Sequence, residues 1–157
     1  MDKNHPSLAT SYNNLSSIYQ ELGGEENLQK ALEYQNKDVE IREKVLDKNH
    51  PSLATSYNNL SSIYQELGGE ENLQKALEYQ NKAVEIREKV LDKNHPSLAT
   101  SYNNLSSIYQ ELGGEENLQK ARIFIDKAID IFKLAFPKGH SNLDIFEKKR
   151  NSINQLL

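Results

Sequence analysis

The chain has 157 residues, a formal net charge of −4 and no cysteine. A mildly acidic chain without a concentrated basic stripe argues against nucleic acid as a partner, and the lack of cysteine excludes disulfides, thiolate metal sites and cysteine nucleophiles. No stretch approaches the roughly 18 apolar residues of a membrane span, and the first residues lack the pattern of a signal peptide. We therefore expect a soluble, cytoplasmic protein without a membrane partner.

An internal repeat dominates the sequence. Residues 2–46 recur as 47–91, a period of 47 − 2 = 45 residues, with Asp38 replaced by Ala83, and a third copy remains identical through Ala121. A period of this length indicates a solenoid, because each unit buries its apolar face against its neighbours and not within itself. We predict an all-α solenoid with repeats at 2–46, 47–91 and 92–136 and a capping helix at 141–157.

Each repeat begins with a helix. In the second repeat it opens at Pro51, which suits a first helical turn because its missing N–H would be unpaired there, and His50 or Asn49 is the N-cap. Gly68 and Gly69 end the helix, since glycine adopts the left-handed conformation beyond a helix end without steric cost. Its apolar residues follow the spacing of a helix with one buried face: Leu53, Tyr57, Leu60, Ile63, Tyr64 and Leu67.

A second helix completes each repeat. It begins between Glu70 and Leu73, where acidic side chains complement the positive end of the helix dipole. Glu78 and Lys82 have the i,i+4 spacing of an ion pair on its exposed side. No strand pattern interrupts this plan. The residues expected to face the core are Leu73, Ala76, Leu77, Val84, Val90 and Leu91.

The last part of the chain departs from the repeat. After Ala121 the second helix becomes more apolar, and a further helix is expected over 141–157. A terminal cap needs an inner face that covers the last repeat and a polar outer face. Its inner side would hold Leu143, Phe146, Ile153 and Leu157, and its outer side Lys148, Lys149 and Arg150. No comparable cap precedes the first helix, which would leave an apolar edge available for pairing.

The order of side chains within a repeat is distinctive. In the first helix an aromatic residue, a leucine, a small residue, a second aromatic residue and a glycine follow one another, and the second helix adds a small residue and a tyrosine. In the first repeat these residues are Tyr12, Leu15, Ser16, Tyr19, Gly23, Ala31 and Tyr34. The pattern resembles the tetratricopeptide repeat (TPR), in the longer form found in kinesin light chains. The resemblance implies a right-handed superhelix in which first helices line a concave groove and second helices form the convex back.

Three features differ from that family: the turn between the helices, a glutamine in the core, and Asp38. The turn GGEEN is a few residues longer than the usual connection, so either the second helix starts earlier or the loop bulges. Gln35 and Gln80 stand where the family usually has an aromatic residue, which thins the core, and Phe124 or Ile125 restores bulk in the third repeat.

Asp38 occupies a position that the family normally fills with alanine. We expect its carboxylate to reach water or a hydroxyl group such as that of Tyr57 or Tyr64, and a role in partner binding is the alternative. Because an unpaired buried carboxylate destabilises a fold, Asp38→Ala is expected to stabilise the protein.

No cluster of side chains predicts an enzyme, a metal site or a cofactor. The four histidines His5, His50, His95 and His140 are one repeat apart. That spacing corresponds to about 16–20 Å, two helix packing distances, whereas a metal ligand lies at about 2 Å. We interpret these histidines as turn residues.

The repeated string SYNNLSSIYQ predicts a binding surface. An asparagine side chain both donates and accepts hydrogen bonds, so rows of asparagine and serine could hold the backbone of an extended peptide; the alternative is that they only fill a solvated helix face. The candidate peptide-binding residues are expected to align in three parallel rows, with one residue from each repeat: Asn13, Asn58 and Asn103; Asn14, Asn59 and Asn104; and Ser17, Ser62 and Ser107. These rows contain no lysine or arginine, which argues against capture of acidic peptide C-termini.

These observations predict a scaffold for protein–protein interaction whose groove binds a protein or peptide. The alternative is a structural segment, natural or engineered, that self-associates through the uncapped N-terminal edge and stacks end to end in a longer solenoid.

Overall fold

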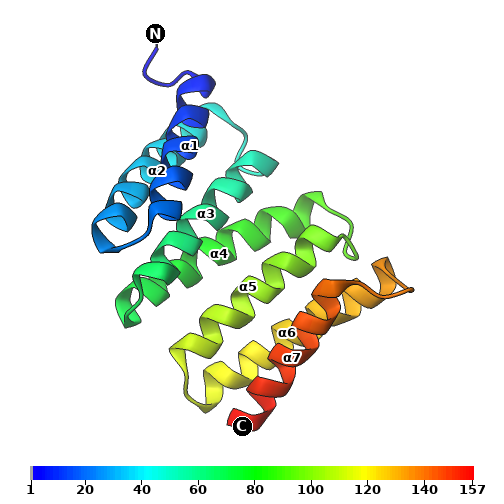
Figure 1. The fold of residues 1–157 in the computed structure, drawn as a ribbon. Helices are drawn as coiled ribbons and strands as arrows, with labels where there is room; N and C mark the ends of the chain where they lie inside the picture. The colour runs from blue at the N-terminus through cyan, green and yellow to red at the C-terminus, as the bar shows by residue number, and fades with distance from the viewer. Residues whose placement is uncertain (1) are drawn as a thin grey trace. The chain divides into compact units, whose positions relative to one another are not determined.

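The computed structural model describes residues 2–157, which form seven α-helices and no strand. The helices are α1 (Pro6–Leu22), α2 (Glu25–Val45), α3 (Pro51–Leu67), α4 (Glu70–Val90), α5 (Pro96–Leu112), α6 (Glu115–Ala135) and α7 (Ser141–Leu156) (Figure 1). The predicted all-α helical-repeat fold is therefore confirmed. Within the described residues, no helix has both the length and the apolar character that crossing a membrane requires.

The helices form two compact units, one through Ile86 and one from Arg87 to Leu157, with the boundary inside α4. In the first unit α1 packs against α2, and α2 against α3; in the second α5 packs against α6, and α6 against α7. Each of these helices therefore contacts a helix next to it in the sequence, as a repeat protein requires.

A histidine caps the start of α1, α3 and α5, which are the first helices of the three repeats and are called the first-type helices, and another caps α7. The Nδ1 atom of His50 accepts a hydrogen bond of 3.1 Å from the backbone N–H of Ser52, ahead of Pro51. His50, and not Asn49, is therefore the N-cap, because the imidazole satisfies a backbone donor that has no partner within the helix. The equivalent caps are His5, His95 and His140.

The turn between the two helices of a repeat is short. Gly23 and Gly24 have φ angles of +68° and +82°, which a residue with a side chain rarely adopts, and α2 begins directly at Glu25. The Nδ2 group of Asn27 donates to the Gly23 carbonyl over 2.8 Å. Of the two alternatives for the GGEEN segment, the earlier helix start is correct.

Serine and alanine bring the two helices of a repeat close together. Ser61 is buried, and its hydroxyl donates to the backbone carbonyl of Ala76 over 2.7 Å; Ser16 and Ser106 make the same bond in their own repeats. A larger residue at either position would separate the helices. The small residues of the pattern therefore set the distance between helices.

A tyrosine from the second helix lies between the two aromatic residues of the first. The ring of Tyr79 is 5.9 Å from those of Tyr57 and Tyr64, and Phe124 takes the same place in the third repeat. In the third repeat the residue equivalent to Gln80 is Ile125, which is fully buried. Of the two residues expected to replace the glutamine, Ile125 is the correct one.

The seventh helix covers α6. Phe146 and Ile153 are buried, and the Phe146 ring meets that of Phe132 edge-on at 5.0 Å. The other two residues expected on the inner face are not buried. Leu143 is only half-buried, and Leu157 is exposed because it lies beyond the end of the helix. Lys148 is exposed as predicted, whereas Lys149 and Arg150 are half-buried, contrary to the prediction that they lie outside.

Candidate functional site

The candidate residues lie along the first-type helices but differ in exposure. On α1, Asn14 and Ser17 are exposed and Asn13 is half-buried. The remaining candidates are half-buried: Asn58, Asn59 and Ser62 on α3, and Asn103, Asn104 and Ser107 on α5. The rows are therefore accessible only in part.

In the first unit, asparagines of neighbouring repeats bind one another. The Nδ2 group of Asn59 donates to Oδ1 of Asn13 over 3.0 Å, and the buried Gln35 donates to the same oxygen over 3.4 Å. We expected Asn13 to align with Asn58 and Asn14 with Asn59. The structure joins Asn13 to Asn59 instead, so the two rows are offset by one residue and contribute to packing between repeats.

A second contact joins α1 and α3 near their C-terminal ends. The Nε2 group of Gln20 donates to the Ser62 hydroxyl over 2.9 Å and also to the Glu66 carboxylate. Ser17, Gln20, Glu21 and Glu66 line a hollow at this point. Polar side chains from two repeats thus line this hollow together.

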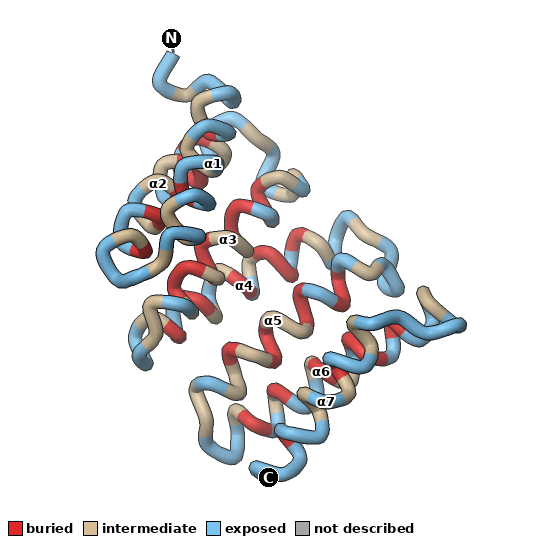
Figure 2. The backbone as a smooth tube through the Cα atoms, viewed as in Figure 1, coloured by how far each residue is buried: buried red, intermediate tan, exposed pale blue. Residues whose placement is uncertain are grey.

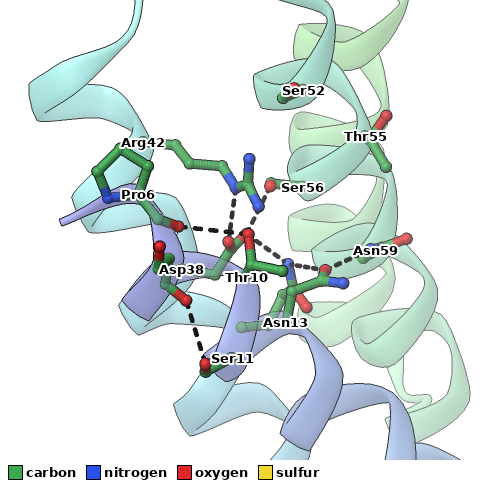
Figure 3. A network of polar contacts seen from close by, with 12 residues as sticks. Pro6, Thr10, Ser11, Asn13, Asp38, Arg42, Ser52, Thr55, Ser56 and Asn59 are labelled. Atoms are coloured by element: carbon green, nitrogen blue, oxygen red, sulfur yellow. Dashed lines mark hydrogen bonds and ion pairs between the residues drawn. The ribbon is translucent and has the colours of Figure 1, made fainter.

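Asp38 is fully buried between α1, α2 and α3 and is completely paired (Figure 3). Its carboxylate accepts hydrogen bonds from Arg42 at 2.6 Å, from the Ser56 hydroxyl at 2.5 Å and from Gln35 at 3.0 Å. The carboxylate reaches a hydroxyl, as expected, but it is that of Ser56 and not that of Tyr57 or Tyr64. Arg42, one helical turn further on, supplies the opposite charge. The Tyr57 hydroxyl donates to Glu43 instead, over 2.6 Å.

Arg42 also lines a small polar hollow together with Asn13, Ser52, Thr55 and Ser56 (Figure 3). Its side chain is 18% exposed, and its Nε atom contacts Asp38. The hollow is therefore polar, with a cation that is already balanced by a carboxylate.

The next repeat has the same arginine without the acid. Ala83 replaces Asp38, and Arg87 donates to the Ser101 hydroxyl over 2.5 Å. Burial lowers the pKa of Arg87. The Tyr102 hydroxyl donates to Glu88 over 2.6 Å, the same distance as from Tyr57 to Glu43.

Burial and these hydrogen bonds affect both phenols. Burial raises the pKa of Tyr57 and of Tyr102 above the ordinary value, and the hydrogen bond that each donates to a carboxylate raises it further. Both hydroxyls therefore stay protonated as donors.

Lys149 of α7 takes the place of an asparagine on the polar surface of the second unit. Its Nζ donates to Oδ1 of Asn103 over 2.6 Å and to the Ser107 hydroxyl over 2.5 Å. Burial lowers its pKa, and the nearby Glu111 opposes that shift. The premise that these rows contain no cation is therefore wrong in the second unit.

The repeat register could have found this lysine. His140 is in step with His5, since 140 − 5 = 135, which is three periods. The same step places Lys149 at the position of Asn14, Asn59 and Asn104. The exact repeats have no cation in these rows, and α7, which supplies it, departs from the repeat in its other residues.

The four histidines are the N-caps of helices. Each Nδ1 atom accepts a backbone hydrogen bond. Among residues 2–157, no three side chains of His, Cys, Asp or Glu lie close enough together to hold a metal ion.

Known proteins share this sequence pattern and fold. A tetratricopeptide repeat family model matches residues 24–71 and 69–134. The crystal structure of a putative kinesin light chain from Podosopora anserina with nearly identical TPR-like repeats is 27% identical, with a TM-score of 0.81; the match covers 97% of this chain and 68% of that chain. No curated relative matches the sequence.

Two more distant structures share the fold alone. BtubC (BKLC) from P. vanneervenii is 20% identical with a TM-score of 0.81, over 97% of this chain and 57% of that chain. The N-terminal domain of stress-induced protein-1 (STI-1) from C. elegans is 18% identical with a TM-score of 0.61, over 96% and 95%. Because the family model spans more than half of the sequence, the chain belongs to the tetratricopeptide repeat family.

Proposed function

We propose that this chain is a protein-interaction scaffold that binds an extended peptide across the polar faces of its first-type helices. Tetratricopeptide repeats mediate protein–protein interaction, and the peptide-binding face is our inference. One observation supports it above the others: Asn13 and Asn59, from two repeats, present amide groups side by side.

The polar surface keeps the capacity to bind a peptide. An asparagine amide has two donors and an acceptor with two lone pairs, so the bond between Asn13 and Asn59 does not exhaust either side chain. Asn14 and Ser17 are exposed next to this pair on α1. Because each hydrogen bond contributes only about 0.5–1.5 kcal/mol, binding would be of modest affinity and tolerant of peptide sequence.

A display library of random peptides tests this function. Peptides selected on the native chain should lose about fivefold or more in affinity for the double variant Asn14→Ala, Ser17→Ala. Asn36→Ala is the matched control, because it removes the same amide from an exposed position on α2 and should leave affinity unchanged. Peptides that bind all three proteins equally, or the absence of any bound peptide, would exclude this face.

A second function rests on α1 itself. Leu15 and Ile18 are 37% and 54% exposed, whereas Leu60 and Ile63, their counterparts in an identical helix, are fully buried. Figure 2 shows the contrast: buried positions run along α3 but are few on α1. We propose that this edge joins the chain to further repeats, either between copies or within one polypeptide.

Sedimentation over a range of concentrations tests the form between copies. Mass that grows with concentration in the native chain, and does not in Ile18→Lys, supports self-association. A constant monomer mass in both proteins excludes it.

A further inference from the structure

The outer face of α1 has the same sequence as a face whose partner the structure shows. Helices α1, α3 and α5 are identical, PSLATSYNNLSSIYQEL. On α3 this face packs against α2. The contacts of α3 and α5 therefore indicate which chemistry α1 can recognise.

Two polar contacts recur at this face. The hydroxyl of a tyrosine donates to a glutamate of the preceding helix over 2.6 Å, from Tyr57 to Glu43 and from Tyr102 to Glu88. One residue earlier stands a buried serine. Ser56 donates to Asp38, which Arg42 pairs, and the corresponding Ser101 accepts from Arg87.

On α1 the matching residues are Ser11 and Tyr12. Ser11 is exposed, and its hydroxyl donates to the Ser7 carbonyl over 3.1 Å. Ser101 makes the same bond to the Ser97 carbonyl at the same distance while it accepts from Arg87. Ser11 therefore already has the orientation in which an arginine can donate to it.

The helix pair α6 and α7 uses different contacts at the same positions. Phe132 and Phe146 take the places of the arginine and the serine and meet at 5.0 Å. Lys133 and Glu147 take the places of the glutamate and the tyrosine and form an ion pair at 3.4 Å. A helix like α6 would place a phenylalanine against Ser11 and a lysine against Tyr12, which satisfies neither.

We propose that the outer face of α1, formed by Ser11, Tyr12, Leu15, Ile18 and Leu22, docks the second helix of another repeat that carries the sequence Ile-Arg-Glu, as in Ile86, Arg87 and Glu88. The arginine donates to Ser11, the glutamate accepts from the Tyr12 hydroxyl, and apolar residues cover Leu15 and Ile18. The face rejects helices of the α6 type. This inference rests on the second proposed function and names the partner of that edge.

An N-terminal extension of the full chain tests the recognition. A copy of residues 70–91 is joined ahead of Asp2, as 70–91 precede Asp92 in the native sequence. Hydrogen exchange of the α1 amides should slow by at least about tenfold, and Tyr12→Phe should reverse part of that protection. In the matched control the added copy carries phenylalanine and lysine in place of its arginine and glutamate, as in α6, and should give no protection.

A double substitution in α1 keeps the test decisive if an extended chain folds poorly. Ser11→Phe with Tyr12→Glu makes α1 resemble α7 at these positions, so protection should return with the phenylalanine–lysine extension and be lost with the arginine–glutamate extension. Equal protection by both extensions, or by neither, would overturn the proposal. So would protection of α1 in the unextended chain that rises with concentration. In a second copy the Ile-Arg-Glu faces of α2 and α4 already pack against α3 and α5, so a different surface would then occupy α1. Recognition is measured here within one chain, so it can fail whether or not native copies associate.

Discussion

The side chains of Asn59 on α3 and Asn13 on α1 form a hydrogen bond of 3.0 Å between two repeats. Lys149 of α7 and Asn103 of α5 repeat that relationship with a cation, over 2.6 Å. Residues that resemble a ligand-binding row therefore also hold neighbouring repeats together, which accounts for asparagine in helices where it is a mediocre helix former.

Removal of the amide at position 59 should weaken the first unit. Asn59→Ala is expected to lower the free energy of unfolding by about 0.5–1.5 kcal/mol, because Asn13 loses a donor at a half-buried position. Urea denaturation measures this change. Asn36→Ala, at an exposed position on α2, should have almost no effect, and equal losses in both variants would mean that the bond to Asn13 contributes nothing.

Asp38→Ala should destabilise the protein, the reverse of the expectation from sequence. The change leaves Arg42 without its charged partner and removes the acceptor of Ser56 and Gln35. Loss of one partner in a buried ion pair costs about 3–5 kcal/mol. Arg42 keeps some exposure and could donate to Ser56 as Arg87 does to Ser101, so we expect a smaller loss of about 1–3 kcal/mol.

Thermal denaturation of Asp38→Ala decides between these outcomes. Ala83→Asp is the informative comparison, because it offers Arg87 the carboxylate that Arg42 already has. A rise in melting temperature on Asp38→Ala would show that the buried network is a net cost to the fold.

The histidine caps should respond to the chemistry of the replacement. His50→Ala removes the acceptor for the Ser52 N–H and should cost about 1 kcal/mol, whereas His50→Asn retains a capping acceptor and should cost much less. Chemical denaturation of the two variants measures the difference. Identical losses would indicate that the imidazole acts through packing and not as a cap.

Stability should fall at alkaline pH because of Tyr57 and Tyr102. Both phenols have a pKa that is raised in the folded state, above the ordinary value of 10.0. As the pH rises above 10, phenols in the unfolded chain lose their protons while these two keep theirs, so the folded state binds more protons and its stability decreases.

Unfolding measured between pH 9 and 11 tests this linkage. The double variant Tyr57→Phe, Tyr102→Phe should show a shallower decline than the native chain, and Glu43→Gln should reduce the contribution of Tyr57 alone. A decline of unchanged slope in the double variant would assign it to other groups.

Lys149 should be replaceable by the residue that the repeat has at its position. Lys149→Asn restores the arrangement of Asn59 and should change stability by less than about 0.5 kcal/mol. Lys149→Ala removes the donor to Asn103 and Ser107 and should cost about 1 kcal/mol. If alanine is tolerated better than asparagine, the cost of burying the ammonium group exceeds the value of its hydrogen bonds.

The sequence by itself determined the helices and their order. Histidine followed by proline starts the first helix of each repeat and two glycines end it, and both signals act within a few residues of the helix ends. The 45-residue period then indicated that helices of adjacent repeats must cover one another. These conclusions needed only local chemistry and the count of residues.

Only the tertiary structure decided which side chains meet. The offset that joins Asn13 to Asn59, the pairing of Asp38 with Arg42 and Ser56, and the contact of Lys149 with Asn103 all join residues through helix packing. The 17 residues of α1 and α3 are identical, yet one helix exposes the leucine and isoleucine that the other buries. A side chain's environment depends on the helix packed against it, which its own sequence does not contain.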